Sequence, residues 1–288
     1  MTLRPALLAA TLALAFGFAH AAEPLQLKVY SADANSFNVS SVLISGDKEA
    51  VVVDAGFTRA DAYRIAANVL DSGKTLTTIL VSNADPDYYF GTETLQALFP
   101  QAKVQATPAV REKIQSTMAG KLAFWGPKMG VNAPAKPVLP EALAGNTLTV
   151  DGQAIEVRGT TGPLARRPYV WVPSLHAIVG NVAVAGNMHV WTADTQTPAE
   201  RQAWIAQLDE MKALKPQVVV PGHMKPGTAL DAQAIDFTRS YLIQFESALQ
   251  QSKDSAGVIQ AMRAAYPELG ESASLELGAK VNKGEMRW

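Results

Sequence analysis

The chain has 288 residues, no cysteine and a formal charge of −1, with 25 basic residues against 26 acidic ones. This near balance argues against nucleic acid or an anionic membrane surface as a partner. The lack of cysteine excludes disulfides and thiolate metal ligands. A hydrophobic fraction of 48% is typical of a compact globular protein.

The first residues predict a secretory signal peptide. Arg4 supplies a positive start, an apolar run follows from Ala6 to Phe18, and Ala19-His20-Ala21 is a small-x-small cleavage site. The run is short for a membrane span, which needs about 20 residues. We therefore expect residues 1–21 to be removed and the mature chain to be periplasmic or secreted, with no membrane association after cleavage.

Strands dominate the first part of the mature chain. Val- and Leu-rich segments predict strands over residues 25–30, 38–45 and 50–54, followed by a helix capped by Thr58 or Asp61 and ending near Leu70. We then expect a strand at 77–81, a helix at 92–99, a strand at 103–106 and a helix at 108–119. Residues 125–140 contain four prolines and two glycines and predict a loop.

The second part repeats the order of strands and then helix. We expect a hairpin of residues 147–150 and 154–158, a strand pair at 169–172 and 177–182, a helix at 198–214 and a strand at 218–220. Residues 229–288 are predicted mostly helical, with Tyr241, Leu242, Ile243 and Phe245 as packing residues. Two strand-rich halves, each closed by helices, predict an α/β (α+β) fold, an αββα sandwich. We assign residues 22–228 to one domain and residues 229–288 to a helical extension packed on it.

The most informative segment follows the strand at 77–81. It reads Ser82-Asn83-Ala84-Asp85-Pro86-Asp87-Tyr88, and Gly91 then opens a helix. It resembles the signature loop of the metallo-β-lactamase superfamily, Thr/Ser-His-x-His-x-Asp-His-x-x-Gly. Ser82, Asp87 and Gly91 match this pattern. Asn83, Asp85 and Tyr88 stand where the family has its three histidines.

Four further landmarks occur in the order of that family. Asp54-Ala55-Gly56 resembles its Asp-x-Gly strand end, and Gly159-Thr160-Thr161-Gly162 resembles its Gly-His-Thr-x-Gly loop, with Thr160 at the histidine. Asn181 stands where the family has an aspartate that bridges two metals. Pro221-Gly222-His223 matches the closing loop intact. The resemblance covers residues 25 to 228 and implies the αββα fold.

The ligand set that the resemblance implies is much reduced. The candidate metal ligands are Asp85, Asp87, Asn181 and His223, whereas a tight zinc site has three or four imidazole or thiolate donors. Oxygen donors favour a hard cation, so the expected cofactor is one divalent metal (Mn, Fe, Zn or Ca) or none. Alternatively Lys225, Arg166 or Arg167 could fill the vacated position and form a buried ion pair.

Three functions remain open. The resemblance implies an exported hydrolase acting on an ester, lactone or amide, with Asp87 and His223 as catalytic residues. In that reading Asn83, Tyr88, Thr160, His189 and Trp191 would contact the small-molecule substrate, and ordinary dizinc β-lactamase activity is not expected. The alternative is a non-catalytic member that binds a small molecule or a protein at the same place. Metal-free catalysis by Asp85, Asp87 and His223 is the third. For His189 and Trp191 the competing interpretation is a hydrogen-bonded loop histidine against a core tryptophan.

Overall fold

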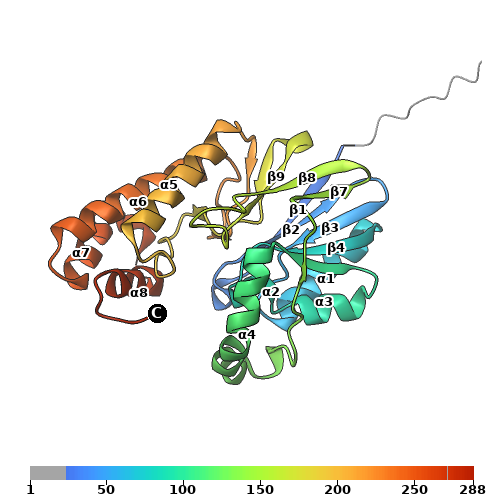
Figure 1. The fold of residues 1–288 in the computed structure, drawn as a ribbon, viewed down its shortest axis with the longest axis horizontal. Coiled ribbons are helices and arrows are strands. Elements are labelled where there is room, and N and C mark those ends of the chain that lie inside the picture. Colours follow the sequence, from blue (N-terminus) through green and yellow to red (C-terminus); the bar gives the residue numbers. More distant parts are fainter. Residues whose placement is uncertain (1–23, 271) are drawn as a thin grey trace, which may run out of the picture.

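Two packed β-sheets form the centre of the molecule (Figure 1). The computed structural model describes residues 24–270 and 272–288, so the predicted signal at residues 1–21 lies outside the described residues. The first sheet has the order β1-β2-β3-β4-β5-β6, antiparallel from β1 to β3 and parallel from β3 to β6. Its strands are β1 (Gln26–Ser31), β2 (Ser40–Ser45), β3 (Glu49–Val53), β4 (Thr75–Val81), β5 (Lys103–Ala106) and β6 (Glu141–Ala142).

The second sheet has the order β12-β10-β9-β8-β7. It is antiparallel except for the parallel pairing of β10 with β12. Its strands are β7 (Thr147–Val150), β8 (Gln153–Arg158), β9 (Tyr169–Val172), β10 (Ala177–Val179) and β12 (Val218–Val219). A short parallel pair, β11 (Ala185–Gly186) with β13 (His223–Met224), lies apart from both sheets and brings His223 into place.

Helices cover the outer faces of the two sheets. Helices α1 (Arg59–Ser72), α2 (Pro86–Tyr89), α3 (Thr92–Leu98) and α4 (Pro108–Met129) belong to the first half, and α5 (Pro198–Ala213) to the second. Thr58 caps α1 and Asp61 completes a capping box, so both residues proposed as the cap take part. None of the described helices combines the length and the apolar composition that crossing a bilayer requires.

Alternating side chains divide the core into three layers. In β3, Val51 and Val53 pack between the sheets, whereas Val52 packs under the helices of the first half. In β9, Val170 faces the same inter-sheet layer, whereas Trp171 faces the α5 side. Successive strand residues point to opposite faces, so both sheets are covered on both sides. The predicted αββα sandwich is confirmed.

Three C-terminal helices extend the second half (orange to red in Figure 1). They are α6 (Gln233–Gln251), α7 (Ser255–Ala265) and α8 (Ala273–Asn282), and α6 packs against α5, α7 and β11. Tyr241, Leu242 and Phe245 are fully buried, as expected, but Ile243 is 47% exposed. Ile243 falls on the outer face of α6 because a helix turns by about 100° per residue.

The prediction of a loop at residues 125–140 is wrong at its start, because α4 continues to Met129. Met118, Leu122, Trp125 and Met129 follow one another at intervals of four, three and four and pack on the core of the first half. This helical stripe outweighs the cost of Pro127, which lies within the last turn of the helix. Trp125 is thereby fixed against Phe37 and Phe57, with ring centroids 5.4 Å away in each case.

Candidate functional site

Three segments bring polar or charged side chains together. The loop after β4 carries Asp85, Asp87 and Tyr88, the loop after β10 carries Asn181, and the closing loop at Pro221-Gly222-His223 carries His223. We call Asp85, Asp87, Tyr88, Asn181 and His223 the Asp87 site. The side chain of Asn83 accepts a hydrogen bond from the amide of Asp85 at 2.8 Å, which shapes the loop as an Asx turn. Pro86 then begins the single helical turn of α2, on which Asp87 and Tyr88 are both buried.

Asp54 supports this loop from the end of β3. The amide and the hydroxyl of Ser82 each donate to its carboxylate at 2.7 Å. Burial raises the pKa of Asp54 to about 8, the Ser82 hydrogen bonds oppose this rise, and the charge of Asp87 adds to it. Asp54 and Ser82 therefore hold the base of the loop in a fixed position and are themselves closed to solvent.

Lys121 of α4 forms an ion pair with Asp85. Its Nζ lies 2.7 Å from the carboxylate of Asp85 and 2.9 Å from the carbonyl oxygen of Ala84. The two side chains are only 24% and 30% exposed, so the pair is partly shielded from water. The sequence suggested three other cations for this role, Lys225, Arg166 and Arg167. Lys225 instead donates to the carbonyl of Leu269, and Arg166 pairs with Glu200.

Asp87 and His223 face each other across the site. The Nε2 of His223 lies 3.4 Å from Oδ2 of Asp87, and its Nδ1 lies 2.9 Å from the carbonyl oxygen of Phe37. Since a carbonyl can only accept, Nδ1 carries a proton and Nε2 is the nitrogen turned to Asp87. Burial raises the pKa of Asp87, Asp85 adds to the rise, and the charges of His223 and Lys121 oppose it.

Asn181 fastens the closing loop. Its side-chain nitrogen donates to the carbonyl of Val220 at 3.0 Å, and its side-chain oxygen accepts from the amide of Val184 at 2.8 Å. Gly222 passes so close that a Cβ there would lie 1.9 Å from the carbonyl oxygen of Asn181 and 2.6 Å from Oη of Tyr88. Both amide atoms of Asn181 are thus committed to the backbone, and glycine is required at position 222.

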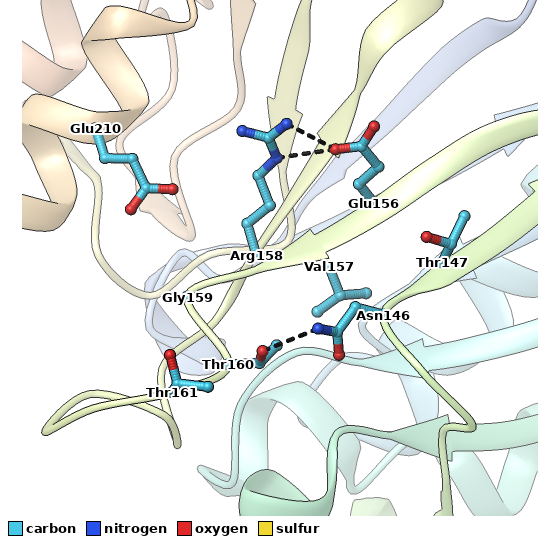
Figure 2. Close-up of a pocket in the computed structure, with 9 residues that line it drawn as sticks. All are labelled: Asn146, Thr147, Glu156, Val157, Arg158, Gly159, Thr160, Thr161 and Glu210. Atoms are coloured by element: carbon cyan, nitrogen blue, oxygen red, sulfur yellow. Dashed lines mark hydrogen bonds and ion pairs between the residues drawn. The ribbon is translucent and has the colours of Figure 1, made fainter.

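The other predicted binding residues, Thr160, His189 and Trp191, make their hydrogen bonds with residues outside this group. Thr160 accepts a hydrogen bond from Asn146 at 3.2 Å on the edge of an open polar cavity of about 480 Å³ (Figure 2). That cavity is lined mainly by β7, β8 and the loop after β8. Its lining includes Thr160 but no residue of the Asp87 site and no other predicted binding residue.

His189 and Trp191 contact the C-terminal part of the chain. The ring nitrogens of His189 lie 2.9 Å from Oη of Tyr241 and 3.2 Å from the carbonyl oxygen of Gly270, and burial lowers its pKa. Trp191 donates to Asp194 at 2.6 Å and packs edge-on against Trp288. The hydrogen bonds of His189 agree with the structural interpretation given above, but Trp191 is only partly buried and so is not a core tryptophan. The proposed substrate contacts of both residues stay predictions.

The donors at the Asp87 site do not fit the two-metal centre of the resembled family. Asp85 is engaged by Lys121, both amide atoms of Asn181 are engaged by backbone, and burial raises the pKa of the Tyr88 phenol well above its usual range. Asp87 and His223 remain as donors. Across residues 24–270 and 272–288, no group of three His, Cys, Asp or Glu side chains is placed to hold a metal ion.

Lys121 is the site residue that sequence reasoning missed. It is 36 positions from Asp85 in the chain and carries no motif around it. Arg167 was named only as a candidate cation, and the structure buries it to 3% exposure over the ring of Trp204, 4.1 Å from the ring centroid. A single lysine between apolar residues of a helix gives no local signal of an acidic partner. Its role depends on how α4 crosses the first sheet.

Comparison with known proteins agrees with this architecture. Residues 34–223, more than half of the chain, match the family model described as metallo-beta-lactamase superfamily. No curated protein sequence matches the chain. Solved structures that resemble it include a metallo-beta-lactamase family protein from Thermus thermophilus, with a TM-score of 0.59 at 15% identity, covering 90% of this chain and 91% of that one.

Two other solved structures show the same fold. A beta-lactamase domain protein from Burkholderia ambifaria has a TM-score of 0.60 at 13% identity, covering 90% of this chain and 84% of that one. A metallo-beta-lactamase from Pontibacter korlensis has a TM-score of 0.55 at 17% identity, covering 76% of this chain and 95% of its own. The chain belongs to the metallo-beta-lactamase superfamily.

Proposed function

We propose that this superfamily member binds a small molecule at the Asp87 site without a metal centre, and that Lys121 supplies the positive charge that a metal supplies in its relatives. The observation that carries this proposal is the ion pair of Lys121 with Asp85 at 2.7 Å. Clustered carboxylates need a cation or a proton to coexist. Here an ammonium group meets that need for Asp85, and burial favours the protonated form of Asp54.

The substituted positions retain hydrogen-bonding groups, which supports a working site. Asn83, Asp85, Tyr88 and Asn181 are all polar, and Asn83 and Asn181 hold the two loops that border the site. Tyr88 keeps a hydroxyl that is fully buried and has no hydrogen-bond partner within the described part of the chain. A buried polar group without a partner costs free energy, and a ligand atom can recover that cost.

The metal content of the purified protein tests this proposal. The protein would be analysed as isolated and after dialysis against manganese, iron, zinc and calcium salts. We expect far less than one metal ion per chain in every case. Near-stoichiometric metal that is lost in Asp87→Ala would overturn the proposal and would support a metal-dependent hydrolase instead.

A second candidate function, metal-free hydrolysis of an ester, lactone or amide, is favoured by the Asp87–His223 pair. With Nδ1 protonated, Nε2 of a neutral His223 can take a proton from water as its oxygen attacks the carbonyl carbon, and then return that proton to the leaving group. Asp87 stabilises the imidazolium formed in between. We expect His223→Gln to abolish any such activity in metal-free protein. Activity that persists in this variant would rule the candidate out.

We also propose that the chain is exported to the periplasm or beyond. The support is the sequence of residues 1–21, with Arg4, the apolar run and the Ala19-His20-Ala21 cleavage site. N-terminal sequencing of the mature protein from a bacterial host tests this. Processing after Ala21 is expected, and a chain that retains residues 1–21 in the cytoplasm would contradict it.

A further inference from the structure

Arg167 is a buried cation with one side of its guanidinium unused. The residue is 3% exposed, and its Nε and Nη2 are buried without a hydrogen-bond partner in the part of the chain that the structure describes. The other contacts of the residue are structural: the guanidinium lies over Trp204, and the carbonyl oxygen accepts from Gln207 at 3.0 Å. An arginine that is buried without an acceptor on its polar edge is costly, so this edge indicates a missing acceptor.

The two unused atoms identify the shape of that acceptor. Nε and Nη2 lie on the same edge of the guanidinium and donate in parallel, which matches the two oxygens of a carboxylate. Arg201 uses this edge on Glu246, with distances of 2.5 and 3.4 Å. Arg239 uses it on Asp209, with distances of 2.6 and 3.3 Å. In Arg167 the same edge is enclosed but lacks its carboxylate.

The two acidic side chains whose charges act on Arg167 already accept hydrogen bonds from other residues. Asp194 and Asp85 are the acids whose charges act on Arg167. Asp194 accepts from the indoles of Trp191 and Trp288, and Asp85 accepts from Lys121. The carboxylate that fits Arg167 is therefore best supplied by another molecule.

Tyr88 provides a third donor. Its hydroxyl is buried without a partner among the described residues, and the charges of Arg167 and Tyr88 act on each other. Burial keeps the phenol protonated, which leaves it a hydrogen to donate. Tyr88 also stacks edge-on against His223, with ring centroids 5.6 Å apart, which connects this donor to the Asp87 site.

We propose that Arg167 and Tyr88 form a carboxylate subsite, and that the ligand of the Asp87 site is a small carboxylic acid. This rests on the proposed metal-free binding function. Because the donor atoms are enclosed, the segment that carries Arg167, residues 159–168, must move to admit the ligand. Its tip at Thr161, Gly162 and Pro163 is exposed, and a Cβ at Gly162 would meet no atom within 4 Å.

NMR titration of the metal-free full mature protein tests the subsite. The probes are benzoate, its neutral isostere benzamide, and inorganic phosphate. We expect benzoate to shift the signals of the Arg167 side chain, and benzamide and phosphate to leave them unchanged. Arg167→Lys retains the charge but loses the paired donors, and Tyr88→Phe loses only the hydroxyl. Each should weaken benzoate binding by about tenfold or more.

Arg166→Lys is the matched control, because Arg166 is adjacent but already paired with Glu200, and it should bind benzoate like the wild type. No binding of benzoate, preference for phosphate, or binding unchanged in Tyr88→Phe and Arg167→Lys would each overturn the subsite. Failure of the metal-free function has a different signature: benzoate binding would then need added metal and would vanish with chelator.

Discussion

At the scale of single residues, Lys121 changes what the Asp87 site can do. It contacts both the carboxylate of Asp85 and the carbonyl of Ala84, so it neutralises the loop and fixes its backbone. A lysine ammonium is a compact charge on a flexible stem, which suits it to a position between a carboxylate and a carbonyl. A side chain on a helix outside the signature loop thereby engages an oxygen atom of Asp85 that a metal ion would have to bind.

Removing this lysine should therefore expose a latent cation site. In Lys121→Ala we expect weak manganese binding, measured by calorimetry, that is absent from the wild type, because Asp85 and Asp87 are left without their ammonium partner. The free energy of unfolding should fall by about 1 kcal/mol or less, since the pair is only partly buried. Lys113→Ala, an exposed change on the same helix, is the control. Equal metal binding in both variants would contradict the role of Lys121.

Asp54 gives a prediction on pH. Its folded pKa, about 8, lies above the ordinary 3.8, so its contribution to stability is fully present below about pH 4 and is lost as the pH rises through 8. The Asp54→Asn side chain cannot titrate. The free energy of unfolding of this variant should therefore rise relative to that of the wild type between pH 5 and pH 8. The gain is at most about 1.4 kcal/mol per pH unit. Urea denaturation at several pH values measures it, and parallel curves for the two proteins would show that Asp54 is not buried as a neutral acid.

At the scale of elements, the site depends on how closely the loops approach one another. Gly222, between β12 and β13, lies against the backbone of Asn181 and the hydroxyl of Tyr88. These loops come from three separate parts of the chain, and Asn181 ties two of them together through the backbone. The polar side chains of the Asp87 site are therefore positioned mainly by backbone packing.

Replacing glycine with alanine at two positions should have opposite effects. Gly222→Ala places a methyl group 1.9 Å from a carbonyl oxygen and should lower the free energy of unfolding by about 2 kcal/mol or more. Gly120→Ala, inside α4 with nothing within 4 Å, should raise it by about 0.5–1 kcal/mol. Thermal denaturation compares the two. A neutral Gly222→Ala would mean that the closing loop is not packed as described.

The elements also show what could be read from the sequence. Ten of the eleven strands in the two sheets were predictable, because strands buried on both faces are runs of apolar residues such as Val51, Val52 and Val53. The two-residue strand β6 was not predicted. The end of α4 was not, because Gly126 and Pro127 suggested a loop while the stripe from Met118 to Met129 depends on packing against the first sheet. Local composition favoured a loop at this position, whereas tertiary contacts favour the helix that the structure shows.

At the scale of the whole molecule, the C-terminal helices are joined to the second sheet through α5. Arg201 of α5 pairs with Glu246 of α6 and also donates to the carbonyl of Thr195 and the side chain of Asn282. Its side chain is 5% exposed, so these bonds are largely removed from water. His189 and Trp191, predicted from position alone to contact substrate, take part in the same junction through Tyr241 and Trp288.

Arg201→Lys should loosen this junction. The lysine cannot make the paired contact with Glu246, and we expect the free energy of unfolding to fall by about 1–3 kcal/mol. Arg239→Lys removes the same kind of paired contact from the exposed Asp209 pair and should have no measurable effect. Chemical denaturation followed by fluorescence compares them. Equal losses in the two variants would show that burial of the Arg201 ion pair does not increase its contribution to the free energy of unfolding.

The candidate site was predictable only in outline. The order of five motifs located Asp85, Asp87, Asn181 and His223 in one region because backbone topology brings those loops together. The partner of Asp85 was not predictable, since it comes from a helix with no motif, and neither was the commitment of both Asn181 amide atoms to the backbone. Ligand identity depends on such long-range contacts, which leave no pattern in the sequence.

An anomalous diffraction experiment on crystals grown with zinc and manganese salts tests whether Lys121 takes the place of a metal ion. We expect electron density for Lys121 within hydrogen-bond distance of Asp85 and no anomalous peak among Asp85, Asp87 and His223. An anomalous peak bound by those three side chains, with Lys121 displaced, would contradict it and show that the superfamily's metal chemistry persists in this chain.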